Sequence, residues 1–254
     1  YWAYGVLGWG GYWAWDPVEN ASLIPWIICL AVIHTLLLQK QAKNTGYPGT
    51  FAKTNLVLLI LTYLLVVFST FLTRSGILSD SSVHSFVSPG AIVYTVLVGF
   101  IGFFTLLSIF LLAKRWKNIS KLPKKEFAVL SKDSALLYGT LVLIASALAI
   151  FVGTTAPIFG QSVEIRFYND MNLPLVILMG LLIGLSFYTN WTQDNQTDII
   201  KRSLPSLVIS LVLTVIVVLM SPLSSIFYIL YFFAATLAIV VNVHMLINRF
   251  KNRS

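Results

Sequence analysis

Residues 9–22 read WGGYWAWDPVENAS and concentrate flat aromatic surface together with two carboxylates. Such a run suits the binding of a flat, hydrophobic, anionic ligand, for which Trp9, Trp13, Trp15 and Asp16 are the candidate residues. The alternative is an aromatic belt at a lipid–water interface. Belts are usually dispersed over several loops, so the concentration in one segment favours a binding site.

The two carboxylates also have the form of a helix start. Asp16 can cap a helix, and Pro17 suits the first helical position. Glu19 then occupies the third helical position, as in a capping box. Like charges repel, so we expect Asp16 to orient another binding group by a hydrogen bond rather than to touch an anion. Whether Asp16 contacts the ligand or only caps the helix stays open at this point.

The elements that must position these residues are membrane helices. The chain of 254 residues is 57% hydrophobic and only 10% charged, whereas soluble domains carry about 25% charged residues. Backbone groups in lipid must bond internally, which favours helices. We therefore predict an all-α, polytopic transmembrane helix bundle of about seven helices, with an outward-facing aromatic segment. Pro174 and Pro205 favour helix starts just before them.

The expected division is an external segment over 1–22 and a transmembrane helical bundle over 23–254. The helices are expected at about 23–39, 54–73, 91–113, 135–156, 172–190, 204–221 and 225–248.

Basic residues predict the sidedness. Fifteen of the 17 Lys and Arg residues fall on one side of this topology, and only Arg74 and Arg166 fall on the other. The positive-inside rule then places the C-terminus in the cytoplasm and the aromatic segment outside, together with loops 74–90 and 157–171. The basic 114–134 loop is expected to anchor the topology and to contact anionic membrane lipid. No nucleic-acid motif accompanies it, so we expect no nucleic-acid partner.

Two of the three histidines, His34 and His84, and one arginine are further candidates. His84 lies in an outward loop, where it is either solvated or a metal ligand. His34 lies about 13 Å beyond Pro25 along the first helix; an ionisable residue at that depth is a functional hypothesis, against a neutral histidine bonded to a neighbouring helix. Arg74 can pair with an anionic group or simply end its helix. His244 we interpret as structural.

The chain resembles the WWD-domain membrane proteins that handle haem in cytochrome c maturation. The run W-G-G-x-W-x-W-D-P-V-E-N-A-S carries that resemblance, and the later T-R-S-G-I-L and S-V-H-S-F segments resemble the CcmF family, with its NrfE relatives, in particular. The resemblance is specific over residues 1–90. It continues more weakly through 153–157 and 167–172.

The resemblance implies a haem lyase subunit, which takes part in haem ligation to apocytochrome c. It implies His84 as an axial ligand of the transferred haem at the WWD segment, and His34 as one of two ligands of a b-type haem within the bundle. Implied partners are the haem chaperone CcmE, a CcmH-type thiol partner and apocytochrome c, at a bacterial inner membrane with the WWD segment periplasmic. We expect a piece of a longer protein, with other family histidines outside it.

Other functions stay open. A CcsA or CcmC type of haem exporter or synthase shares the WWD signature, although the V-E-N-A-S and V-H-S-F contexts argue against it. A membrane transporter would show intramembrane charges and broken helices in corresponding halves. An assembly scaffold would not need His34 at its depth. A Soret band that depends on His34 or His84 separates haem handling from both.

Overall fold

The computed structural model describes residues 5–6, 13–87, 89–161, 163–191, 195–221 and 224–251. Within these ranges seven helices are long and apolar enough to cross a membrane, which confirms the predicted all-α transmembrane fold. They are α2 (Pro17–Asn44), α3 (Ala52–Arg74), α4 (Ala91–Ser120), α5 (Lys132–Thr155), α6 (Ile165–Ser186), α7 (Gln196–Met220) and α8 (Ile226–Lys251), and the short 3-10 helix η1 (Ala156–Phe159) follows α5.

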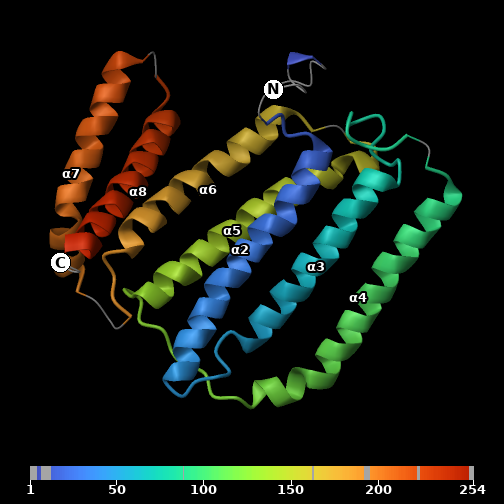
Figure 1. Ribbon diagram of the computed structural model, residues 1–254, viewed down its shortest axis with the longest axis horizontal. Helices are drawn as coiled ribbons and strands as arrows, with labels where there is room; N and C mark the ends of the chain where they lie inside the picture. The colour runs from blue at the N-terminus through green and yellow to red at the C-terminus, as the bar shows by residue number, and fades with distance from the viewer. Residues whose placement is uncertain are drawn as a thin grey trace.

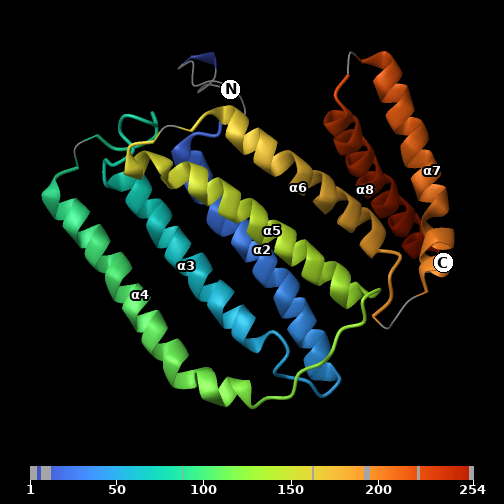
Figure 2. The ribbon, with the colours of Figure 1, turned by 180° about the vertical axis from the view of Figure 1, so that it is seen from behind.

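The helices lie side by side in one curved row. Across the row the order is α4, α3, α2, α5, α6, α8 and α7, and the main contacts join neighbours in this order (Figures 1 and 2). The centre of the row is therefore α2 and α5, which are far apart in sequence. α4 at one edge has no buried residue and packs mainly on α3.

Two kinds of packing hold the row together. Between α2, α3 and α5 a hydrophobic core forms from Ile28, Leu65 and Ile150 and their neighbours. Between α6 and α8 the backbones approach closely, because Gly180 and Gly184 follow the small-residue spacing that allows helices to pack in membranes. A Cβ added at Gly184 would lie 2.7 Å from a Leu237 side-chain carbon.

The central helix begins earlier than the sequence-based range. α2 starts at Pro17 rather than near 23, because the Asp16 side chain caps it and Pro17 stands at its first position. The helix start anticipated in the D-P-V-E run is thus part of the membrane helix itself. His34 consequently lies about 26 Å along α2 from the first residue of the helix, and about 13 Å from Pro25 as expected.

The helices α6 and α7 also begin before their expected ranges. Pro174 and Pro205 lie inside them and not in their first turns, so the prediction that these prolines mark helix starts was wrong. A proline removes one backbone hydrogen bond, which a membrane helix tolerates when neighbouring groups satisfy the freed carbonyl. The earlier start of α6 puts Tyr168 and Asn169 on a helix rather than in a loop.

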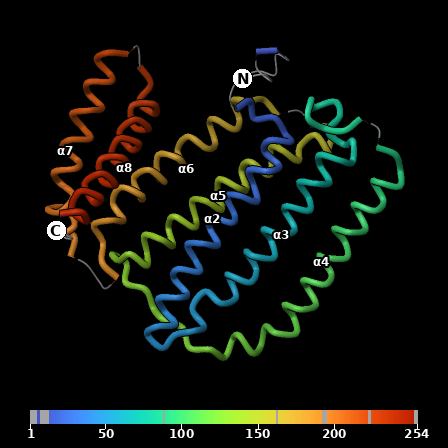
Figure 3. Tube along the Cα trace, in the orientation of Figure 1, coloured from blue at the N-terminus to red at the C-terminus, as the bar shows by residue number. Residues whose placement is uncertain are grey.

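The ends of the helices form two opposite groups of connections (Figure 3). One group contains residues 13–16, the loop from 75 to 90, η1 with the connection to α6, and the connection from α7 to α8. The other contains the described parts of the connections after α2, α4 and α6, and most of the described Lys and Arg residues lie in the connection after α4 or in the helix ends at this side. The candidate ligand-binding segment therefore meets loop 75–90 and the start of α6 at one end of the row.

Candidate functional site

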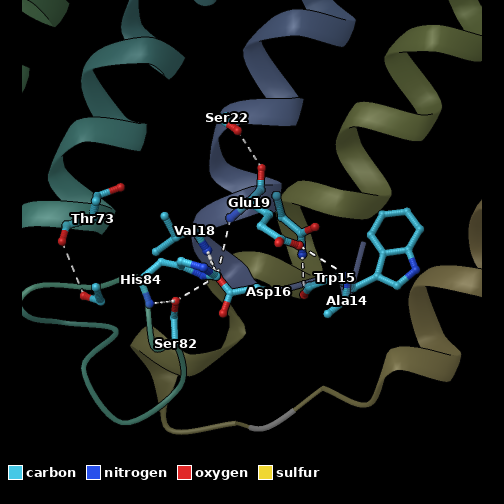
Figure 4. Close-up of polar contacts among 11 residues, drawn as sticks. Ala14, Trp15, Asp16, Val18, Glu19, Ser22, Thr73, Ser82 and His84 are labelled. Carbon is cyan, nitrogen blue, oxygen red and sulfur yellow. Dashed lines mark hydrogen bonds and ion pairs between the residues drawn. The ribbon is translucent and has the colours of Figure 1, made fainter. Parts of the chain in front are cut away.

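Asp16 contacts several groups at the end of the row where the aromatic segment meets loop 75–90. Its Oδ1 accepts hydrogen bonds from the backbone N–H groups of Val18, at 2.8 Å, and Glu19, at 3.4 Å, and so caps α2 (Figure 4). The same oxygen accepts a 2.7 Å hydrogen bond from the Ser82 hydroxyl, which lies 66 residues away in sequence. A carboxylate is favoured here because helix N-termini carry partial positive charge. The Asp16 side chain thus caps α2 directly after the aromatic segment and holds the loop that carries Ser82 against the start of this helix.

His84 lies against this carboxylate. Its Nδ1 is 3.4 Å from Asp16 Oδ1, and its backbone N–H donates to Ser82 Oγ at 3.1 Å (Figure 4). The two side chains are 28% and 13% exposed, so the pair is partly sheltered from water. Carboxylates in this position orient metal-binding imidazoles and fix which ring nitrogen bears the proton. The 3.4 Å contact is of ion-pair length, and it places the carboxylate on the Nδ1 side of the ring.

The loop that carries His84 is anchored at two points. Leu78 is fully buried against Ala21 and Leu72. The backbone N–H of Phe86 donates to the Thr73 carbonyl at 2.9 Å, which closes the loop onto the end of α3. These contacts hold His84 at a set position beside the start of α2.

Trp15 is held by three groups from two helices. Its ring stacks on Tyr168 with centroids 5.1 Å apart and planes 8° apart, and its Nε1–H donates to Asn169 Oδ1 at 2.9 Å. Its carbonyl accepts a 2.9 Å hydrogen bond from Asn20 Nδ2. The backbone of Trp15 has a φ of 57°, a conformation that non-glycine residues adopt only when their surroundings impose it.

Trp13 completes the described part of the aromatic segment. Its ring meets Trp15 edge-on, with centroids 5.9 Å apart, and remains 39% exposed. The backbone N–H of Ala14 donates to Glu19 Oε2 at 3.3 Å, which fixes the chain between the two tryptophans. Trp9 lies outside the described residues. The described segment thus presents one fixed indole and one exposed indole.

Tyr168 and Asn169 are site residues that sequence reasoning did not single out. They stand 153 and 154 positions after Trp15, and no local spacing connects them to it. Tyr168 is buried, and Gly153 of α5 makes room for its ring, since a Cβ at that glycine would lie 2.7 Å from it. Residues 167–172 did resemble the family's pattern, and that was the single available signal.

A cavity of about 630 Å³ opens beside Trp15. It lies between the start of α2, loop 75–90, η1 and the start of α6, and Trp15, Asp16 and Tyr168 contribute to its wall. Its volume is in the range of pockets that hold small molecules and cofactors. The cavity therefore places space for a ligand of substantial size beside Trp15 and Tyr168, and His84, which is not among its lining residues, adjoins it through Asp16.

Arg74 is exposed at the end of α3, and its guanidinium lies 5.4 Å from the centroid of the Phe86 ring. It thus stands in the same loop region as His84, although the contact described for it is with an aromatic ring. Arg166, the other basic residue of this end, pairs with Asp170 at 3.1 Å.

His34 occupies a separate place within the row. It lines a cavity of about 350 Å³ between α2, α5 and α6 whose other walls are almost entirely apolar, including Leu30, Leu143 and Met179. Its Nδ1 is buried and makes no hydrogen bond within the described part of the chain. Gly139 of α5 lies opposite, where a Cβ would be 3.3 Å from that nitrogen. A half-buried imidazole in apolar surroundings with space beside it fits an iron ligand.

His244 has polar partners at the opposite end. Its Nδ1 lies 3.2 Å from the Tyr188 hydroxyl and 3.4 Å from Ser206 Oγ, and these two hydroxyls are 2.7 Å apart. The cluster joins the end of α6 to α7 and α8. A structural role accounts for this histidine.

The chain is similar in sequence to proteins of cytochrome c biogenesis. Residues 1–77 match the family described as Cytochrome C assembly protein. The chain is 33% identical over 231 residues to the cytochrome c-type biogenesis protein CcmF of Escherichia coli (strain K12), covering 87% of this chain and 33% of that protein. It is 37% identical over 198 residues to the probable cytochrome c-type biogenesis protein NrfE of the same organism, covering 75% and 34%.

A solved structure described as "Cytochrome c Heme Lyase CcmF" matches with a TM-score of 0.68 and 27% sequence identity, over 98% of this chain and 36% of that one. The chain belongs to the CcmF and NrfE type of cytochrome c-type biogenesis protein. It spans about a third of the length of the curated relatives that it matches. The seven apolar helices of the described residues and the bacterial relatives indicate that it is a bacterial membrane protein. In this CcmF-type chain the family match over 1–77 includes the aromatic segment, Asp16 and His34.

Proposed function

We propose that this CcmF-type chain holds haem at two separate places and takes part in the ligation of haem to apocytochrome c. The observation that carries the proposal is the Asp16–His84 pair beside the stacked Trp15. An oriented imidazole supplies an iron ligand, and a fixed indole next to an exposed one supplies flat apolar surface for a porphyrin.

At the external site the residues have distinct roles. His84 binds the iron of the transferred haem, and Asp16 orients His84 without touching the haem. Trp13 and Trp15, with Trp9 of the same segment, contact the porphyrin. Arg74 pairs with a haem propionate, which an exposed guanidinium at this end of the chain favours. Haem is the cargo of this site.

Within the bundle His34 binds a b-type haem, for which the second ligand lies elsewhere in the family's chain. The apolar cavity and the buried, unpaired Nδ1 support this assignment. A bound b-type haem supplies one-electron chemistry, which would keep the transferred iron reduced. The chain itself contributes the imidazole and an environment that excludes water.

The partners follow from the family. CcmE delivers haem, a CcmH-type protein presents reduced apocytochrome thiols, and apocytochrome c receives the haem through thioether bonds. The external site faces the periplasm and the basic end of the row faces the cytoplasm, with the chain in the bacterial inner membrane. The distribution of basic residues supports this sidedness.

Absorption spectroscopy of the full-length protein, purified in detergent, tests the proposal. We expect His34→Ala to lose a co-purifying b-type haem, and His84→Ala to retain it but to lose haem transferred at the external site. His244→Ala is the matched control, since this histidine has hydroxyl partners, and it should leave both haem signals unchanged. A wild-type protein without haem after haem-replete expression would refute the proposal.

The principal alternative from another class, a coupled transporter, has a different signature. The Asp, Glu, Lys and Arg side chains of the described helices stand in the terminal turns or close to them, whereas His34 stands nearer the middle of α2. That distribution favours cofactor ligation over a relay of intramembrane charges. Substrate flux in vesicles that contain no haem would reverse this preference.

A further inference from the structure

The basic end of the row contains a cleft that the haem sites do not use. It lies where α3 begins, at the lower end of that helix in Figure 1, and has a volume of about 230 Å³. Three lysines line it, namely Lys53, Lys124 and Lys125, and no acidic residue is among the lining residues.

Two connections are joined to form this cleft. The backbone N–H of Gly49 donates to the Pro123 carbonyl at 2.9 Å, and the N–H of Lys125 donates to the buried Thr50 hydroxyl at 2.8 Å. Gly49 is required at its position, since a Cβ there would lie 2.5 Å from the Leu122 carbonyl oxygen. The cleft is therefore built by specific contacts between residues more than 70 positions apart.

The three lysines differ in whether an acidic partner neutralises their charge. Lys125 Nζ pairs with the buried carboxylate of Asp133 at 2.6 Å, so its charge is matched. Lys53 Nζ lies 4.0 Å from the centroid of the Trp116 ring, which orders the ammonium without neutralising it. Lys124 is exposed. Two cationic groups thus remain for an anion.

The backbone at the start of α3 also favours an anion in the cleft. No side chain caps α3 and its first turn has no acidic residue, so the positive end of its dipole meets no negative charge from its own sequence. The lysines and the helix end favour the same kind of ligand, a phosphate group.

The surroundings distinguish a lipid phosphate from a free one. The rings of Phe51 and Phe127 pair beside the cleft, with centroids 5.5 Å apart. Along α3, directly beyond Lys53, the exposed side chains of Leu56, Val57 and Leu59 continue as apolar surface. A phosphate with attached acyl chains uses both surfaces, whereas inorganic phosphate uses the lysines alone. Basic pockets between transmembrane helices bind anionic headgroups in this manner.

We infer that this cleft is a binding site for the phosphate of an anionic phospholipid, with Lys53 and Lys124 as its cationic groups. The inference is independent of the haem sites, which lie at the other end of the row and within it.

The test measures retention of phosphatidylglycerol by the full-length protein, using native mass spectrometry and titration in nanodiscs. A lysine that contacts the lipid headgroup directly is worth about fivefold in affinity, so Lys53→Gln with Lys124→Gln should weaken binding by about tenfold or more. The control is Lys114→Gln with Lys117→Gln, which removes the same charge from exposed residues of α4 outside the cleft. It should change binding by about twofold or less.

Two results would overturn the inference. An equal loss in both double variants would mean diffuse attraction to the basic end. Displacement of phosphatidylglycerol by inorganic phosphate in the millimolar range would make a free anion the ligand. Lys124→Gln alone, at an exposed side chain, provides a variant that should fold normally, and circular dichroism checks it.

Discussion

Substitution of Asp16 separates helix capping from the proposed orientation of His84, because its carboxylate caps α2 and also contacts His84. Asp16→Ala removes two capping hydrogen bonds to α2 and the hydrogen bond from Ser82. Loss of a cap costs about 0.5–2 kcal/mol, and loss of a hydrogen bond to a charged group costs about 1.5–3 kcal/mol. Together they amount to about 2–5 kcal/mol, which should lower the thermal midpoint clearly.

Asp16→Asn keeps most of this stability. Asparagine caps helices about as well as aspartate, and its carbonyl oxygen can still accept from the Ser82 hydroxyl. The charge beside His84 is lost, and outer partners of metal-binding histidines contribute about 10- to 100-fold to metal affinity or activity. We therefore expect near-normal thermal unfolding but haem binding at the external site weakened by about 10- to 100-fold.

The assay is haem titration and thermal unfolding of the full-length protein in detergent, with the Soret band as the signal. Asp170→Asn is the control, since it removes the same charge from an exposed side chain at the same end. If Asp16→Asn binds haem like the wild type while His84→Ala does not, Asp16 is only a helix cap and the orientation role is refuted.

Three further substitutions test packing and pairing, one at the external site and two elsewhere in the row. Tyr168→Leu removes the ring that stacks on the indole and should lower haem affinity at the external site together with the near-ultraviolet circular dichroism of tryptophan, whereas Tyr168→Phe should retain both. Gly184→Ala should destabilise by about 1–3 kcal/mol through overpacking against α8, and Gly99→Ala, with open space around it, should not; thermal unfolding compares them. Lys125→Met should destabilise by about 3–5 kcal/mol in chemical denaturation, because it leaves the Asp133 carboxylate buried and unpaired, and an unchanged midpoint would contradict this.

Local features of the chain were predictable from sequence. The D-P-V-E run indicated a cap followed by a proline at the first helical position, and the structure has both. The apolar runs predicted the membrane helices, because lipid leaves the backbone no alternative to internal hydrogen bonding. The starts of α6 and α7 were not predictable from Pro174 and Pro205, since those prolines stand inside their helices.

The contacts of the site that join residues far apart in the chain could not be predicted from a single sequence. The positive φ of Trp15 goes against the preference of its residue type, and Tyr168, Asn169 and Asn20 hold its ring and backbone. Nothing within the aromatic segment indicates partners 154 residues away. The hydrogen bond from Ser82 to Asp16 likewise depends on how loop 75–90 folds.

If His34 and His84 both bind haem iron, as proposed, the geometry of α2 requires that they bind different haems. Asp16 caps α2, and His34 stands 18 positions later on the same helix, about 27 Å further along its axis. His84 Nδ1 lies 3.4 Å from Asp16, so it stays at the start of that helix. Nitrogen ligands bind about 2 Å from their metal, and two axial ligands of one iron are therefore only about 4 Å apart. The two histidines cannot meet on one iron, and a protein that uses both must hold two haems or find a separate partner for each histidine.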